Sequence, residues 1–155
     1  MTESMSDRIE KQIDLPAPIE KVWHALTDHV AFSQWFGVNL ERPFVVGEKS
    51  FGQITYPGYE HVRMEVEVIA IHPMDRFAFL WHPYAIEPDV DYSREPPTTV
   101  EFTLEPTESG TLLKVVESGF DRIPEARRSE AYRMNEGGWT EQMKNIERYV
   151  SNHTD

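Results

Sequence analysis

Cysteine is absent from the 155-residue sequence, so a disulfide framework, a thiolate metal site and a catalytic thiol are all excluded. Basic residues are also scarce. The chain has 15 lysines and arginines against 27 aspartates and glutamates, which gives a formal net charge of -12. A protein of that charge repels phosphate groups, so neither nucleic acid nor an anionic membrane surface is an expected partner.

Long apolar runs are missing as well. No stretch approaches the roughly 20 apolar residues of a membrane helix. Residues 1–12, MTESMSDRIEKQ, are polar and acidic where a signal peptide would be basic and then apolar. We therefore expect a cytoplasmic protein without a membrane span. Its length favours one domain, over residues 8–151, with a flexible N-terminal tail at 1–7 and a C-terminal tail at 152–155.

The apolar residues that are present follow the periods of strands and helices. Alternation predicts a first strand over 8–15, and apolar residues three and four apart then predict two short helices, up to residue 28 and over 29–36. A run of strands follows: a hairpin over 43–57 that turns near Gly47, then 61–71, 75–83, 98–106 and 111–120. A long helix begins near Pro124. Antiparallel strands with segregated helices indicate the α+β class.

The last helix carries an unusual pair of glycines. Tyr132, Trp139, Met143, Ile146 and Val150 form its apolar stripe, and Gly137 and Gly138 precede the tryptophan directly. Each glycine in a helix interior costs about 1 kcal/mol relative to alanine. The pair therefore indicates either a close approach between helix and sheet or an open space beside the helix.

The segments DLPAPIEKVWHALTD, FSQWF, VEFTLEP, GTLLKVVESGF and NEGGWTEQMKNIERYV resemble the family related to the activator of heat-shock-protein-90 ATPase. That family belongs to the START-like, birch-pollen-allergen-like superfamily (SRPBCC), which includes polyketide cyclases and lipid-transport proteins. The resemblance implies a helix-grip fold, in which a curved antiparallel sheet wraps around a long C-terminal helix. It also implies a cavity between them that holds an apolar ligand in many members, and a link to the stress response.

The aromatic residues are the strongest indication of a binding site, because small-molecule pockets are lined mainly by such side chains with a few polar groups. Any one of them is more often an ordinary core residue, and we assign Trp23 to the core. As candidate ligand-binding residues we name Trp35, Phe36, Phe51, Tyr56, Phe79, Trp81, His82, Phe102, Glu117, Gly138, Trp139 and Met143. The long loop over 82–97, with four prolines, is expected to border the cavity entrance.

Catalytic and metal motifs are not found. The six histidines match no zinc spacing, so we expect no metal and no other cofactor. No nucleophile elbow or phosphate loop occurs, and we name no catalytic residue. Glu65, Glu67 and Glu101 are expected on the solvent face of the sheet. Glu117 shares this expectation, but it interrupts an apolar strand and is our choice if any of these carboxylates turns into an apolar cavity, where its pKa would be raised.

Three functions follow from these observations. The first is the binding of a small apolar or aromatic molecule without catalysis. The second is a co-chaperone-like interaction that regulates a chaperone ATPase, which the charge of -12 would support through an acidic docking face. The third is an enzyme of the cyclase or hydratase type, which needs an inward acid or base such as Glu117 or His82.

Overall fold

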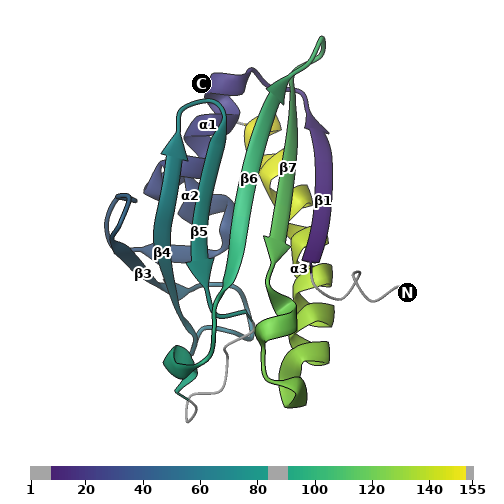
Figure 1. Ribbon diagram of the computed structural model, residues 1–155. Coiled ribbons are helices and arrows are strands. Elements are labelled where there is room, and N and C mark those ends of the chain that lie inside the picture. Colours follow the sequence, from purple (N-terminus) through teal and green to yellow (C-terminus); the bar gives the residue numbers. More distant parts are fainter. Residues whose placement is uncertain (1–7, 84–90, 153–155) are drawn as a thin grey trace, which may run out of the picture.

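The computed structural model describes residues 8–83 and 91–152. It contains one seven-stranded antiparallel sheet and three α-helices (Figure 1). The strands are β1 (Arg8–Leu15), β2 (Val38–Leu40), β3 (Lys49–Ile54), β4 (Arg63–His72), β5 (Arg76–Trp81), β6 (Thr98–Pro106) and β7 (Thr111–Ser118). The helices are α1 (Ile19–Thr27), α2 (His29–Phe36) and α3 (Glu125–Asn152). The α+β helix-grip fold expected from the sequence is confirmed.

The sheet has the strand order β1-β7-β6-β5-β4-β3-β2, so the first and last strands of the chain are neighbours. Figure 1 shows α3 running along one face of the sheet behind β7 and β1, with α1 and α2 on the same face. Both short helices contact α3. All three helices therefore cover one face, and the sheet curves around them.

The two short helices are separated where the sequence predicted. The Asp28 carboxylate accepts a hydrogen bond from the backbone N–H of Ala31 at 3.0 Å and so caps α2. Gly37 ends α2 with a φ of 90°, a left-handed conformation that glycine adopts without a steric penalty. Pro18, predicted as the first helical position, is the N-cap of α1, so the helix begins one residue later than predicted, at Ile19.

One predicted strand was wrong. The hairpin expected over 43–57 does turn at Gly47, whose φ is 89°, but residues 43–46 form no strand. The partner of β3 is instead β2, in which Val38 pairs with Ile54 and Leu40 with Gly52. Phe44 packs into the core, whereas Val45 and Val46 are exposed. β7 is also shorter than expected, because Gly119 turns the chain after Ser118 with a φ of 101°.

The core lies between the sheet and the helices. The inward faces of β4 to β7 contribute residues that are almost fully buried, and α3 contributes the stripe of Trp139, Met143, Ile146 and Val150 that its sequence predicted. A chain of aromatic contacts crosses this core; Phe102, for example, packs edge-to-face on Trp139 with ring centroids 5.7 Å apart. Helix and sheet are thus joined near the middle of α3.

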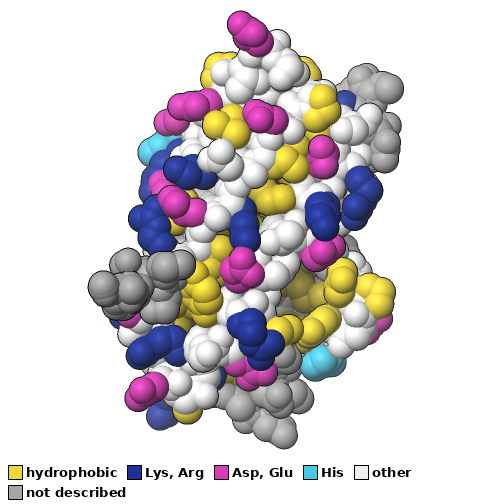
Figure 2. Space-filling model, turned by 90° about the vertical axis from the view of Figure 1, so that its right-hand side faces the viewer, with side chains coloured by type: hydrophobic (Ala, Val, Ile, Leu, Met, Phe, Trp, Pro, Cys, Tyr) yellow, Lys and Arg dark blue, Asp and Glu magenta, His cyan; other side chains and the backbone are white. Residues whose placement is uncertain are grey.

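The surface carries charges of both signs. Figure 2 shows acidic and basic side chains interspersed over one side of the molecule, with hydrophobic side chains between them. Within the described ranges 8–83 and 91–152, no helix is long and apolar enough to cross a membrane. The expected tails at 1–7 and 152–155 lie outside the described residues, apart from Asn152, which ends α3.

Candidate functional site: a cavity between the sheet and helix α3

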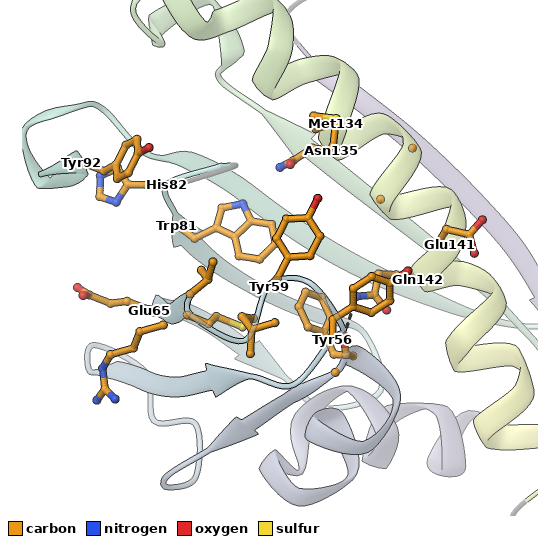
Figure 3. A pocket seen from close by; sticks show the side chains of 18 of the residues that line it. Tyr56, Tyr59, Glu65, Trp81, His82, Tyr92, Met134, Asn135, Glu141 and Gln142 are labelled. Atoms are coloured by element: carbon orange, nitrogen blue, oxygen red, sulfur yellow. Dashed lines mark hydrogen bonds between the residues drawn. The ribbon is translucent and has the colours of Figure 1, made fainter. Parts of the chain in front are cut away.

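A cavity of about 670 Å³ opens between α3 and the part of the sheet formed by β3, β4 and β5 (Figure 3). That volume is within the range of roughly 300–1,000 Å³ that is usual for small-molecule sites. The cavity arises because the core contacts of α3 concentrate around Trp139, while the helix face beside it carries glycines and amides. The sheet curves past this face without side chains to fill the space.

The sheet side of the cavity is mainly apolar and aromatic. Trp81, at the end of β5, forms its floor, and Tyr56 and Tyr59 come from the connection between β3 and β4. Met64 and Val62 lie beside them. In Figure 3 the side chains of Tyr59 and Trp81 project into the space from one side, and Met134 and Asn135 on α3 lie across from them. Tyr56 is 51% exposed, so part of this wall is accessible from solvent.

The helix side is more polar, and beside the larger side chains of Arg133, Met134 and Glu141 it presents amides and glycines. Asn135, Gly138, Gln142 and Asn145 line the cavity and recur three and four residues apart, which places them on one face of α3. A methyl group built on Gly137 or Gly138 would meet no atom within 4 Å apart from the adjacent residues and the nearby backbone of α3 itself. Neither glycine is therefore needed for close packing, and the space beside them belongs to the cavity.

Behind the aromatic floor lies a buried carboxylate, that of Glu117 on β7, with 0% exposure. Its Oε2 accepts hydrogen bonds from Trp81 Nε1 at 2.7 Å and Thr98 Oγ1 at 2.5 Å. Its Oε1 accepts from Trp139 Nε1 at 2.8 Å and Asn135 Nδ2 at 2.9 Å. One carboxylate thus joins two strands and α3, and it fixes both indole rings. Glu117 is the carboxylate that the sequence singled out in case one of the strand glutamates turned inward.

Burial raises the pKa of Glu117 above its ordinary value near 4.5, and the hydrogen bonds from Thr98, Trp81, Trp139 and Asn135 oppose that increase. The desolvation of the carboxylate is the larger effect. Glu117 does not line the cavity directly, because Trp81 and Asn135 stand between it and the open space. Its arrangement suits positioning of the wall residues rather than proton transfer to a ligand.

The ends of the loop over 82–97 are attached to the start of α3. Arg127 donates to both carboxylate oxygens of Glu95, at 2.7 to 3.1 Å, and to the carbonyl oxygen of Pro83 at 3.0 Å. Its guanidinium lies 4.7 Å from the ring centre of Tyr92. His82 Nε2 lies 2.9 Å from the carbonyl oxygen of Glu95. His82, Asp91 and Tyr92 border the cavity, whereas the middle of the loop, 84–90, lies outside the described residues.

Apart from Glu117, the candidate residues named from the sequence fall into three groups. Phe36, Tyr56, Trp81, His82 and Gly138 line the cavity, and Trp139 lines a small recess of about 90 Å³ beside it. Trp35, Phe79, Phe102 and Met143 are buried in the core and do not line it. Phe51 lies on the outer face of the sheet, where the guanidinium of Arg63 covers its ring at 5.0 Å.

Several lining residues were not named from the sequence, among them Tyr59, Asn135, Gln142 and Asn145. A signal for the three amides exists, since they share the helical face of Gly138. Of the histidines, His24, His61 and His72 are exposed, and His82 is held by Glu95. Among the residues that the structure describes, no three His, Asp or Glu side chains come together in a way that could hold a metal ion.

A curved sheet that wraps around a C-terminal helix and leaves a cavity against it defines a START-like helix-grip protein. Within that class, the chain belongs to the family described as Activator of Hsp90 ATPase homolog 1-like protein, whose model matches residues 16–151. No curated protein matches the chain.

Solved structures agree with this assignment. Protein MLL2253 from Mesorhizobium loti is 27% identical, with a TM-score of 0.74 over 96% of this chain and 98% of that one. DynU16, a protein of the dynemicin biosynthetic locus, is 25% identical with a TM-score of 0.73; the match covers 94% of this chain but 48% of DynU16. An Aha1 dimer from Colwellia psychrerythraea has a TM-score of 0.70 over 96% of this chain and 98% of that one, and at 17% identity it supports the fold alone.

Proposed function

We propose that the protein binds a small apolar or aromatic molecule in the cavity between the sheet and α3 and does not transform it. The observation that carries this proposal is the open space beside Gly137 and Gly138, where a built methyl group meets no atom within 4 Å apart from the adjacent residues and the nearby backbone of α3. A helix that served only to pack against the sheet would not keep two glycines at a cost of about 1 kcal/mol each.

The chemistry of the wall selects the ligand class. Trp81, Tyr56 and Tyr59 offer ring faces, on which a flat apolar molecule stacks or packs edge-to-face. The net charge of -12 disfavours strongly anionic molecules. Burial of an apolar ligand against these rings would release water from both surfaces, which is the usual driving force for such sites.

Native mass spectrometry of freshly purified protein, compared with the same sample after denaturation, tests whether a molecule co-purifies. A second measurement titrates the protein with an apolar fluorescent probe. Saturable binding of one probe per chain is the expected result. Failure to retain a molecule, combined with no saturable binding of any apolar probe, would contradict the proposal.

Membership of the family supports a second candidate, a co-chaperone-like interaction that regulates a chaperone ATPase. The exposed Val45 and Val46, 45% and 52% accessible, lie in the segment before β3 and could contribute to a protein contact. The test is direct: the ATPase rate of a purified Hsp90-type chaperone is measured with and without this protein. Stimulation would favour this function. The cytoplasmic location and a part in the stress response remain predictions.

The enzyme candidate has weaker support. It required Glu117 or His82 as an acid or base facing the ligand. Glu117 is fully buried behind Trp81 and already accepts hydrogen bonds from four side chains. His82 uses Nε2 in its contact with the carbonyl oxygen of Glu95. Both groups are engaged in holding the protein structure.

A further inference from the structure

The cavity has two chemically different walls, and this difference bears on which aromatic molecules fit. The sheet wall presents rings, whereas the α3 wall presents amides and the bare backbone at Gly138. A ligand between them would place one side against apolar groups and its opposite edge against polar ones. The α3 wall also carries the charged side chains of Arg133 and Glu141, and its neutral polar side chains are the amides of Asn135, Gln142 and Asn145.

Two of the three amides are occupied within the protein. Gln142 donates from Nε2 to the carbonyl oxygen of Phe36 at 2.9 Å, and its Oε1 accepts from Asn145 Nδ2 at 3.0 Å. The Oδ1 of Asn145 accepts in turn from Arg148. Both amide oxygens therefore already accept a hydrogen bond, and both amide nitrogens are tied to neighbouring groups.

Asn135 differs, because its nitrogen and its oxygen have separate environments. Nδ2 contacts both oxygens of Glu117, at 2.9 and 3.2 Å. Trp81 and Trp139 can only donate to the same carboxylate, which confirms that it acts as the acceptor and fixes the amide with its nitrogen inward. The Asn135 Oδ1 has no hydrogen-bond partner within residues 8–83 and 91–152, and Asn135 lines the cavity. Figure 3 shows this side chain extending from α3 on the side of Trp81.

We propose that Asn135 gives the site a preference for aromatic ligands that carry a hydrogen-bond donor, a phenolic hydroxyl or an N–H, on the edge that faces α3. This inference rests on the proposed function, since it concerns the same cavity. The Asn135 Oδ1 accepts the ligand's hydrogen bond while Trp81 packs against the ligand's ring. Glu117 acts as a positioning residue, because its carboxylate holds the Asn135 amide in the orientation that presents the oxygen.

The experiment compares naphthol with its methyl ether, two probes of similar shape of which only the first can donate a hydrogen bond. Their dissociation constants are measured by equilibrium dialysis for the wild type, for Asn135→Leu and for Asn39→Leu, an exposed asparagine of β2 that does not line the cavity. Leucine has nearly the shape of asparagine but offers no acceptor. The wild type is expected to bind naphthol about five- to tenfold more tightly than the ether, the effect of one hydrogen bond.

Asn135→Leu should abolish this preference and leave the affinity for the ether close to that of the wild type. Asn39→Leu, the same substitution outside the cavity, should keep the ratio between the two probes. Asn135→Ala serves the same purpose should the leucine variant fail to fold. Equal affinities of both probes for the wild type, or a ratio that survives loss of the Asn135 amide, would overturn the inference while leaving the proposed function intact. Failure of both probes to bind the wild type would instead contradict the proposed function.

Discussion

Trp81 and Trp139 lie with ring centroids 5.8 Å apart, one on the sheet and one on α3, and their indole N–H groups donate to different oxygens of the same Glu117 carboxylate. Trp139 is 3% exposed and belongs to the core, whereas Trp81 borders the cavity. The carboxylate therefore connects the core to the wall of the site. Its loss should affect stability and ligand binding together.

The first prediction concerns Glu117→Gln, which keeps the shape of the side chain. An amide NH₂ group cannot accept the hydrogen bonds that one carboxylate oxygen now accepts, so an indole N–H or the Thr98 hydroxyl is left without a partner. The free energy of unfolding should fall by about 1–3 kcal/mol in chemical denaturation. Glu105→Gln, an exposed carboxylate on β6, is the control and should change stability by about 0.5 kcal/mol or less. Equal effects of the two variants would contradict this prediction.

The second prediction is a pH dependence. The pKa of Glu117 is raised in the folded state above its ordinary value near 4.5 because burial disfavours the charged form. A folded-state pKa above the unfolded one makes this group's contribution most favourable below about pH 4.5, and that contribution is lost as pH rises through the raised folded pKa. The difference in unfolding free energy between wild type and Glu117→Gln should therefore shift in favour of the wild type as pH falls through this window. The contributions of the other carboxylates are the same in both proteins and cancel when the two unfolding free energies are subtracted. A difference in unfolding free energy that stays constant with pH would therefore contradict the raised pKa of Glu117.

Much of the fold follows from local sequence signals. Asp28 and Gly37 bound α2 because a carboxylate cap and a left-handed glycine are short-range effects. The missed pairing of β2 has a physical cause too: a strand of three residues directly after Gly37 is too short to show alternation. The Phe44–Val46 segment has the composition of a strand, yet two of its three side chains are exposed. Pairing between strands depends on tertiary contacts that composition does not contain.

The site was less predictable than the fold. Glu117 could be singled out from the sequence because it interrupts an apolar strand, and the structure puts it on the same face of β7 as Leu113 and Val115, both of which are buried. The aromatic residues could not be sorted, since core and cavity wall have the same composition. Phe102 and Trp81 lie on neighbouring strands with their side chains on the same side, and both rings pack against Trp139, with centroids 5.7 and 5.8 Å away. Only Trp81, at the end of β5, lines the cavity.

A third prediction concerns Arg127, which ties the loop to α3. The guanidinium contacts both oxygens of Glu95 and the carbonyl oxygen of Pro83, in a half-buried position. Arg127→Lys keeps the charge but cannot bind the carboxylate with two parallel N–H groups. We expect both Arg127→Lys and Arg127→Ala to lower the unfolding free energy, the alanine variant by about 1–3 kcal/mol and the lysine variant by less. Thermal melts of the two variants beside the wild type measure this order; an unchanged midpoint for Arg127→Ala would show that the contact does not stabilise the fold.

Chelation provides a fourth prediction. Three or four ligands at suitable distances are needed for a structural metal site, and the described part of the chain brings no such group together. Addition of a chelator should therefore leave the melting temperature and the binding of an apolar probe unchanged. A large loss of melting temperature that added metal restores would contradict it.

The last prediction distinguishes a cavity glycine from a packing glycine. Gly138→Ala should raise the unfolding free energy by up to about 1 kcal/mol, because alanine has the higher helix propensity and the added methyl group meets no atom within 4 Å apart from the adjacent residues and the nearby backbone of α3. Gly138→Leu should leave the fold intact but reduce binding of an apolar fluorescent probe strongly, since the side chain would occupy the space beside Trp81 and Asn135. Thr140→Leu adds the same side chain at an exposed position of α3 that does not line the cavity, and it should bind the probe as the wild type does. Thermal melts and probe titrations of the three variants give the answer. Overpacking of a core typically lowers the unfolding free energy by about 1–3 kcal/mol. If Gly138→Ala loses that much, helix and sheet approach closely here and the glycine serves packing.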